Sequence, residues 1–126
     1  MKNSTELAIL NYIDVPTLII NKNGTIEFCN NAACLNLNRT AEELIGNHFD
    51  KFMLPEVAER RKAILKECLE SGRKMVFEDV RDGRNLLHSV NPLSSDQAII
   101  TLADVTNWNQ KEQQNIQLEK LVETRT

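Results

Sequence analysis

Two turn signals near opposite ends of the chain constrain its fold more than any other feature. Asn23-Gly24 and Asp82-Gly83 each separate a pair of strand-like runs. The four runs are rich in aliphatic and aromatic residues and cover residues 17–21, 25–29, 75–80 and 85–90. Asn-Gly and Asp-Gly adopt positive φ angles readily, so each pair favours a tight β-hairpin. The chain therefore predicts antiparallel strands near both ends, and not alternating parallel βαβ units.

Helix signals lie between the two hairpins. Asn30 is a suitable N-cap for one short helix, and Thr40 with Glu43 forms a capping box for a second that stops at Gly46. Pro55 suits the first turn of a longer helix that ends at Ser71-Gly72. The residues expected on its inner face are Val57, Ile64, Leu65 and Cys68. With a last apolar run at 98–103, the sequence predicts an α+β domain.

The length of 126 residues suits one domain with helical flanks. We expect an N-terminal flanking helix over 1–15, a globular domain over 16–106 and a C-terminal linker helix over 107–126. In the last segment Leu118 and Val122 have coiled-coil spacing, but the register covers barely two heptads.

Charge and composition exclude several classes of partner. Fifteen basic against eighteen acidic residues give a net charge of -3, the wrong sign for a protein that binds a nucleic-acid backbone. No apolar run is long enough to span a membrane, so we expect no membrane contact within these residues. Three cysteines without a CxxC pair suit a reducing compartment, and cytoplasmic location is the expectation.

Catalytic and metal-binding patterns are also missing from the sequence. The four glycines stand singly at turns and form no phosphate-binding loop, and we find no nucleophile paired with a base. His48 and His88 belong to no HExxH motif or Cys/His cluster. We therefore predict neither a catalytic residue nor a metal site.

Five short motifs resemble those of PAS domains, the sensory modules of histidine kinases and other signalling proteins. They are Ile13-Asp14-Val15-Pro16, Asn23-Gly24-Thr25-Ile26, Asn30-Asn31-Ala32-Ala33, Glu42-Glu43-Leu44-Ile45-Gly46 and Asp104-Val105-Thr106. The resemblance implies a five-stranded antiparallel sheet with helices packed on one face and a small cavity that can hold a ligand. It also implies a homodimer formed through the flanking helices, and an effector domain downstream in the parent chain.

Within such a domain, several residues are candidates for the cavity wall. Period-two alternation places His88 on the same side as Leu86 and Val90. The other candidates are Phe28, Phe52, Ile64 and Phe77. The alternative for all of them is an ordinary core role, with His88 hydrogen-bonded in the core or at a sheet edge.

The cofactor stays unassigned, and two familiar ones are disfavoured. Haem-binding PAS domains carry a histidine on or near the long helix, whereas here residues 55–72 contain none and His48 only precedes them. Covalent flavin needs a cysteine in a GRNCRFLQ-like motif, which the surroundings of Cys34 do not match. Buried small hydrophobes are the better interpretation of the three thiols.

The resemblance implies a relay at the exit of the last strand, formed by Asp104 and Thr106. The alternative is that Thr106 is only a helix N-cap. We therefore predict a cytoplasmic sensory domain of a multidomain signalling protein, with a histidine kinase as the expected parent. A ligand-free module that only dimerises is the alternative, and an enzyme with a small pocket ranks third.

Overall fold

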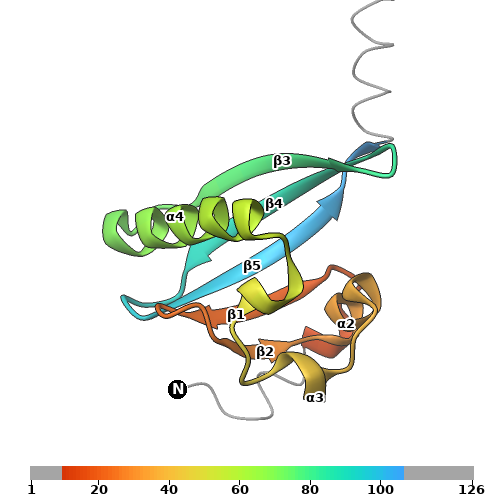
Figure 1. Cartoon of the computed structure of the whole chain (residues 1–126), viewed down its shortest axis with the longest axis horizontal. Coiled ribbons are helices and arrows are strands. Elements are labelled where there is room, and N and C mark those ends of the chain that lie inside the picture. The colour runs from red at the N-terminus through yellow and green to blue at the C-terminus, as the bar shows by residue number, and fades with distance from the viewer. Residues whose placement is uncertain (1–9, 107–126) are drawn as a thin grey trace, which may run out of the picture.

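The computed structural model describes residues 10–106, which form one antiparallel sheet covered on one face by helices (Figure 1). The strand order is β2-β1-β5-β4-β3, so β2 and β3 form the two edges. The strands are β1 (Thr17–Asn21), β2 (Ile26–Cys29), β3 (Met75–Arg81), β4 (Arg84–Pro92) and β5 (Gln97–Asp104). The helices are η1 (Leu10–Tyr12), α2 (Asn31–Leu37), α3 (Ala41–Leu44), η2 (Phe49–Phe52) and α4 (Pro55–Ser71). The expected α+β class is confirmed.

Both hairpins form where the turn signals predict them, with different turns. In the β3–β4 hairpin Asp82 and Gly83 have φ angles of 51° and 75°, as a two-residue turn with two positive φ angles requires. The β1–β2 turn is wider. The Asn21 carboxamide oxygen accepts hydrogen bonds from the N–H groups of Asn23 and Thr25, and within the Asn-Gly pair only Gly24 has a positive φ, of 89°.

The helix boundaries follow the predicted caps. Asn30 accepts a hydrogen bond from the Ala33 N–H, and Thr40 and Glu43 form the reciprocal bonds of a capping box. Helix α4 begins at Pro55, whose missing N–H costs nothing in the first turn, and closes at Gly72 in the left-handed region.

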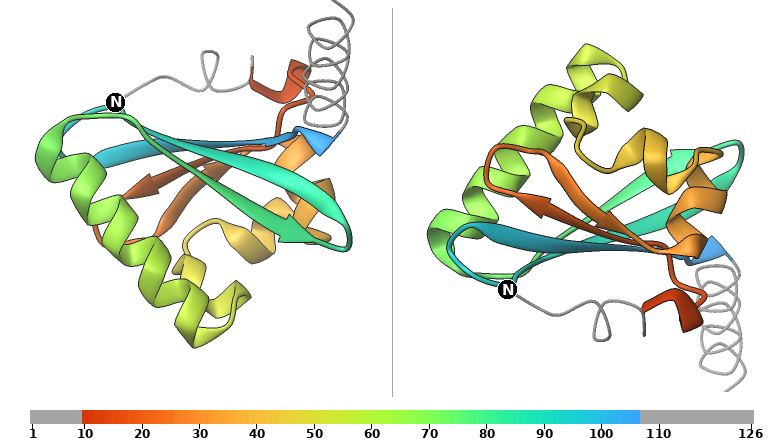
Figure 2. Two further views of the ribbon diagram at one scale, coloured as in Figure 1. Left: turned by 90° about the horizontal axis from the view of Figure 1, so that it is seen from above. Right: turned by 90° about the horizontal axis from the view of Figure 1, so that it is seen from below.

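The hydrophobic core lies between the sheet and these helices, and Figure 2 shows α2, α3, η2 and α4 on the same side of the sheet. Helix α4 buries Leu65 and Cys68 in the core as predicted, while Val57 and Ile64 are half-buried. The largest fully buried side chains are Ile26, Leu44, Leu86, Asn30 and Cys68.

Asn30 is a polar member of this set and connects three segments. Its oxygen accepts from the N–H groups of Thr17 and Ala33, both at 2.9 Å. Its amide nitrogen donates to the carbonyls of Leu10 at 2.9 Å and Val15 at 2.8 Å, with a longer contact to Ile13 at 3.4 Å. The side chain thereby holds the segment before β1 against the start of α2.

This network also explains a difference from the expected N-terminal helix. Within its described part, residues 10–15, only the three-residue η1 is helical, and Tyr12 is 90% exposed. The Leu10 carbonyl accepts both the Ile13 N–H of this short turn and the Asn30 amide, and the carbonyls of Ile13 and Val15 also face the Asn30 amide. The rest of that prediction, and the linker helix over 107–126, lie outside the described residues.

Candidate functional site

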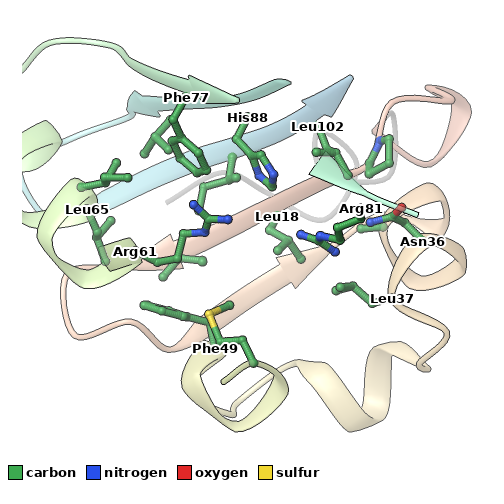
Figure 3. A pocket seen from close by; sticks show the side chains of 17 residues that line it. Leu18, Asn36, Leu37, Phe49, Arg61, Leu65, Phe77, Arg81, His88 and Leu102 are labelled. Carbon is green, nitrogen blue, oxygen red and sulfur yellow. The ribbon is translucent and has the colours of Figure 1, made fainter. Parts of the chain in front are cut away.

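A cavity of ≈ 130 Å³ lies between the sheet and the helices (Figure 3). An engineered protein cavity of about 150 Å³ holds a benzene molecule, so this space is of about the size of one ring. Its walls are mainly apolar and include Ile20, Phe49, Ile64, Val90 and Ile100. Strands β1, β3, β4 and β5 form one side and helices α2, η2 and α4 the other.

Charged side chains meet at one part of this wall. Arg61 of α4 donates to Oδ2 of Asp79 at 3.1 Å, and Arg81 Nε donates to the same oxygen at 3.3 Å. The Arg61 guanidinium lies 4.1 Å from the ring centre of Phe77, within the range of a cation–π contact. Arg61, Phe77 and Arg81 all line the cavity.

His88 is the histidine of this cluster. It is 8% exposed, and its ring stacks on Phe77 at a centroid distance of 4.5 Å. Its Nε2 is buried without a hydrogen-bond partner among the described residues and lies 3.8 Å from Asp79 Oδ2, too far for a hydrogen bond. Burial, followed by the positive charges of Arg61 and Arg81, lowers the pKa of His88 to about 4, against the opposing effect of Asp79. The imidazole is therefore neutral at pH 7.

The neighbouring charges respond to the same environment. Burial lowers the pKa of Arg61, although the adjacent Asp79 carboxylate partly offsets this. For Asp79, burial alone would raise the pKa, but the hydrogen bond from Arg81 and the charges of both arginines outweigh it and lower the pKa. The cluster therefore holds two cations, one anion and a neutral imidazole.

Three of the five predicted cavity residues line the cavity, namely Ile64, Phe77 and His88. Their contact with a ligand stays a prediction. Phe28 lies elsewhere, because it pairs with Ile19 while the neighbouring Leu18 faces the cavity, and alternation therefore places Phe28 on the opposite face of the sheet. Phe52 packs against the core with the Arg39 guanidinium 5.0 Å above its ring, and Phe49 occupies the cavity wall instead.

The sequence interpretation missed the charged part of the wall. A basic run such as Arg60-Arg61-Lys62 on a helix is typical of solvated surface, whereas the Arg61 side chain is only 18% exposed. A usable signal was present in β3, because Asp79 and Arg81 share the parity of Phe77 and must lie on its side of the strand. Nothing in the sequence alone indicated that α4 would bring Arg61 to them.

The predicted relay residues lie close together at the end of β5. The Thr106 hydroxyl donates to Asp104 Oδ1 at 2.6 Å, and the Thr106 N–H donates to the same oxygen at 3.0 Å. Arg84 lies 4.0 Å from the other carboxylate oxygen and is the basic partner of Asp104 among the described residues. These two hydrogen bonds from Thr106, with the charge of Arg84, lower the pKa of Asp104.

Thr106 also ties the exit of β5 to the start of β4. Its hydroxyl oxygen accepts the Asn85 N–H at 2.8 Å, and the Asn85 carbonyl accepts the Val105 N–H at 2.9 Å. A role for this hydroxyl as a cap of a following helix involves residues beyond 106, outside the described part of the chain.

Strand β4 connects this exit to the cavity. Leu86 pairs with Asp79 on one side and with Asp104 on the other, and His88 pairs with the cavity residue Leu102. The β3–β4 turn joins the cavity residue Arg81 to Arg84. The charged wall of the cavity and the Asp104–Thr106 exit are therefore adjacent parts of one antiparallel segment.

Comparison with known protein families identifies this arrangement. The sequence model of the family described as the PAS fold matches residues 10–124. The chain belongs to the PAS fold family. The resemblance seen in the sequence and the PAS-like fold expected from it are both confirmed. The comparison with curated proteins gave no match.

Solved PAS structures share the fold at low sequence identity. The PAS domain of BvgS from Bordetella pertussis has a TM-score of 0.68 at 16% identity, with 92% of this chain and 95% of that chain covered. The sensory box sensor histidine kinase from Vibrio cholerae gives 0.65 at 14% identity, covering 78% and 86%. The PAS domain of RpfR from Cronobacter turicensis, solved in complex with BDSF, gives 0.63 at 19% identity, covering 75% and 96%.

Within residues 10–106, no group of three or more histidine, cysteine, aspartate or glutamate side chains is placed to hold a metal ion. Over the same part of the chain, no helix combines the length and the apolar character that crossing a membrane requires.

Proposed function

We propose that this PAS domain is the sensory module of a multidomain signalling protein, with a histidine kinase as the favoured parent. Occupancy of the cavity changes the end of β5, and the change passes through Asp104 and Thr106 to the chain that follows. The similarity to the histidine kinase from Vibrio cholerae supports the choice of parent. The free thiols Cys29, Cys34 and Cys68 suit a cytoplasmic module.

The observation that carries this proposal is the shared strand β4. Leu86 of β4 pairs with Asp79 on one neighbouring strand and with Asp104 on the other. Asp79 accepts hydrogen bonds from both arginines of the cavity wall, and Asp104 accepts hydrogen bonds from Thr106 at the end of β5. A ligand that moves Arg61 or Arg81 changes their hydrogen bonds to Asp79. Because Asp79 pairs with Leu86, the change reaches β4. Asn85 of the same strand is hydrogen-bonded to Thr106 and Val105. A shift of β4 therefore reaches the end of β5 through direct hydrogen bonds.

The cavity itself is suited to a small molecule. The RpfR PAS domain was solved with BDSF bound, so this fold does hold small ligands in one relative. Haem and flavin are multi-ring groups, and a cavity of ≈ 130 Å³ would have to enlarge to admit either. His48, the histidine nearest α4 in sequence, uses its Nδ1 to accept the Asp50 N–H and is not among the cavity-lining residues.

The test is an Asp104→Ala variant of the full-length protein. We expect altered signal-dependent output with an unchanged circular dichroism spectrum, because Asp104 is exposed and its loss removes only the bonds from Thr106 and the Arg84 contact. Asp96→Ala is the matched control, since Asp96 is also an exposed aspartate whose side-chain ion pair, with Lys22, is long at 3.9 Å. Normal regulation in the Asp104 variant would refute the relay.

The alternative function is a ligand-free module that only dimerises. The predicted homodimer uses the flanking helices, and sedimentation of chains with and without residues 1–9 and 107–126 tests it. Native mass spectrometry separates the two functions, because a co-purifying molecule favours sensing. A dimer without any bound molecule, combined with normal regulation in Asp104→Ala, would favour the alternative.

A further inference from the structure

The charged wall of the cavity carries an inference about the ligand, which rests on the proposed sensory function. Arg61 and Arg81 each bring a positive charge, and Asp79 brings the single negative charge between them. His88 lies beside them as a neutral ring. Two cations and one anion leave one positive charge unbalanced at a largely apolar cavity.

Hydrogen-bond donors are in excess as well. Arg61 and Arg81 each donate one N–H to the same oxygen of Asp79, although a guanidinium has five N–H donors. The Arg61 side chain is 18% exposed and keeps some contact with water. Its unused N–H groups are therefore available to a further acceptor in the cavity that Arg61 lines.

His88 supplies an independent observation. Its side chain is about nine-tenths buried and lines the cavity, and its Nε2 has no hydrogen-bond partner among residues 10–106. Figure 3 shows Arg61, Arg81 and His88 reaching toward the same space from α4, β3 and β4. Three polar groups from three elements therefore converge on one part of an otherwise apolar wall.

We propose that the cavity binds a small monocarboxylic acid. Its carboxylate lies against Arg61 and Arg81 with an oxygen available to His88, and its apolar body, of about one ring in size, packs among Phe49, Ile64 and Val90. One carboxylate supplies the single negative charge that the cluster lacks and accepts the unused N–H groups. The planar guanidinium and the planar carboxylate also match in geometry.

Benzoate and benzamide test this proposal on the unmodified chain. They have the same ring and nearly the same shape, and only benzoate carries the charge. By isothermal titration at pH 7 we expect benzoate to bind about ten- to a hundredfold more tightly than benzamide. A hydrogen bond to a charged acceptor strengthens binding about tenfold more than one to a neutral acceptor, and the carboxylate faces two arginines. Equal affinities, tighter binding of benzamide, or no saturable binding of benzoate at millimolar concentration would overturn the proposal.

Substitutions of Arg61 and Arg81 test whether the acid binds at these two residues. Arg61→Gln and Arg81→Gln should each weaken benzoate binding about tenfold and leave benzamide binding unchanged. Arg60→Gln is the matched control, because Arg60 is the exposed neighbour on the same helix and should bind benzoate like the parent chain. Equal loss in the control, or amide shifts from benzoate that fall outside the cavity, would refute the site.

Failure of this proposal can be distinguished from failure of the sensory function. If benzamide binds as well as benzoate while Asp104→Ala still disturbs output, the cavity senses a different class of molecule. If benzoate binds as expected while Asp104→Ala is regulated normally, the acid site stands and the relay is wrong.

Discussion

Asn30 offers the sharpest stability test, because its buried carboxamide holds β1, α2 and the segment before β1 together. Asn30→Ala removes four hydrogen bonds of 2.8–2.9 Å at once. The two N–H partners, on Thr17 and Ala33, are 2% and 1% exposed and cannot turn to water. The carbonyl partners belong to Leu10 and Val15, which are partly or fully exposed and can be hydrated.

The expected cost follows from this asymmetry. A buried donor left without a partner costs about 1–3 kcal/mol, and a solvated carbonyl costs little. Two orphaned N–H groups, one of them at the N-cap of α2, therefore lower the free energy of unfolding by about 3 kcal/mol. For a domain of this size each kcal/mol corresponds to about 4–8 °C in melting temperature, so the loss is about 12–24 °C.

Urea unfolding followed by circular dichroism measures this loss. Asn31→Ala is the matched control, since Asn31 is the exposed next residue and its side chain makes no hydrogen bond within residues 10–106. We expect the control to lie within about 0.5 kcal/mol of the parent chain. A loss below about 1 kcal/mol in Asn30→Ala would show that the two buried N–H groups find other partners, contrary to the reasoning.

Two further predictions concern histidines. Because His88 has a folded pKa of about 4 and an ordinary unfolded value near 6.5, the unfolded chain takes up a proton first as the pH falls, and this group should cost about 3 kcal/mol of stability between pH 7 and 4. In His88→Phe, where Asp79, Arg61 and Arg81 still face the position, urea titrations should no longer show this loss of stability between pH 7 and 4. An unchanged pH dependence of the unfolding free energy would contradict the assignment to His88. Gly24→Ala should destabilise more than Gly46→Ala by denaturant midpoint. Both glycines have φ +89°, but only at Gly24 would the new Cβ clash with the His48 ring. Equal losses would mean that the imidazole moves aside freely.

Local signals explain why most of the fold was predictable. Asn30, the Thr40–Glu43 box and Pro55 set helix starts through bonds within a few residues, and Asp82-Gly83 sets the hairpin in the same way. These effects need no knowledge of the tertiary structure. Among residues 10–15 the helix does not extend past Tyr12, where carbonyls bond the Asn30 side chain fifteen to twenty residues away.

The cavity was predictable only where one face of a strand was clear. His88 lies between Leu86 and Val90 in alternation, so its side was determined by the sequence. Phe28 was assigned to the wrong side because β1 and β2 carry apolar residues on both faces, and alternation then does not choose between them. The Arg61–Asp79–Arg81 cluster depends on how α4 crosses the sheet, which no local pattern encodes.

In the proposed function, the cavity and the exit of β5 respond as one unit. The most direct measurement compares amide ¹H–¹⁵N spectra of the chain with and without saturating benzoate. We expect shifts at cavity residues together with shifts at Asn85, Val105 and Thr106, the residues whose bonds join β4 to the exit. Benzoate shifts that stop at the cavity wall and leave these three amides unchanged would contradict it.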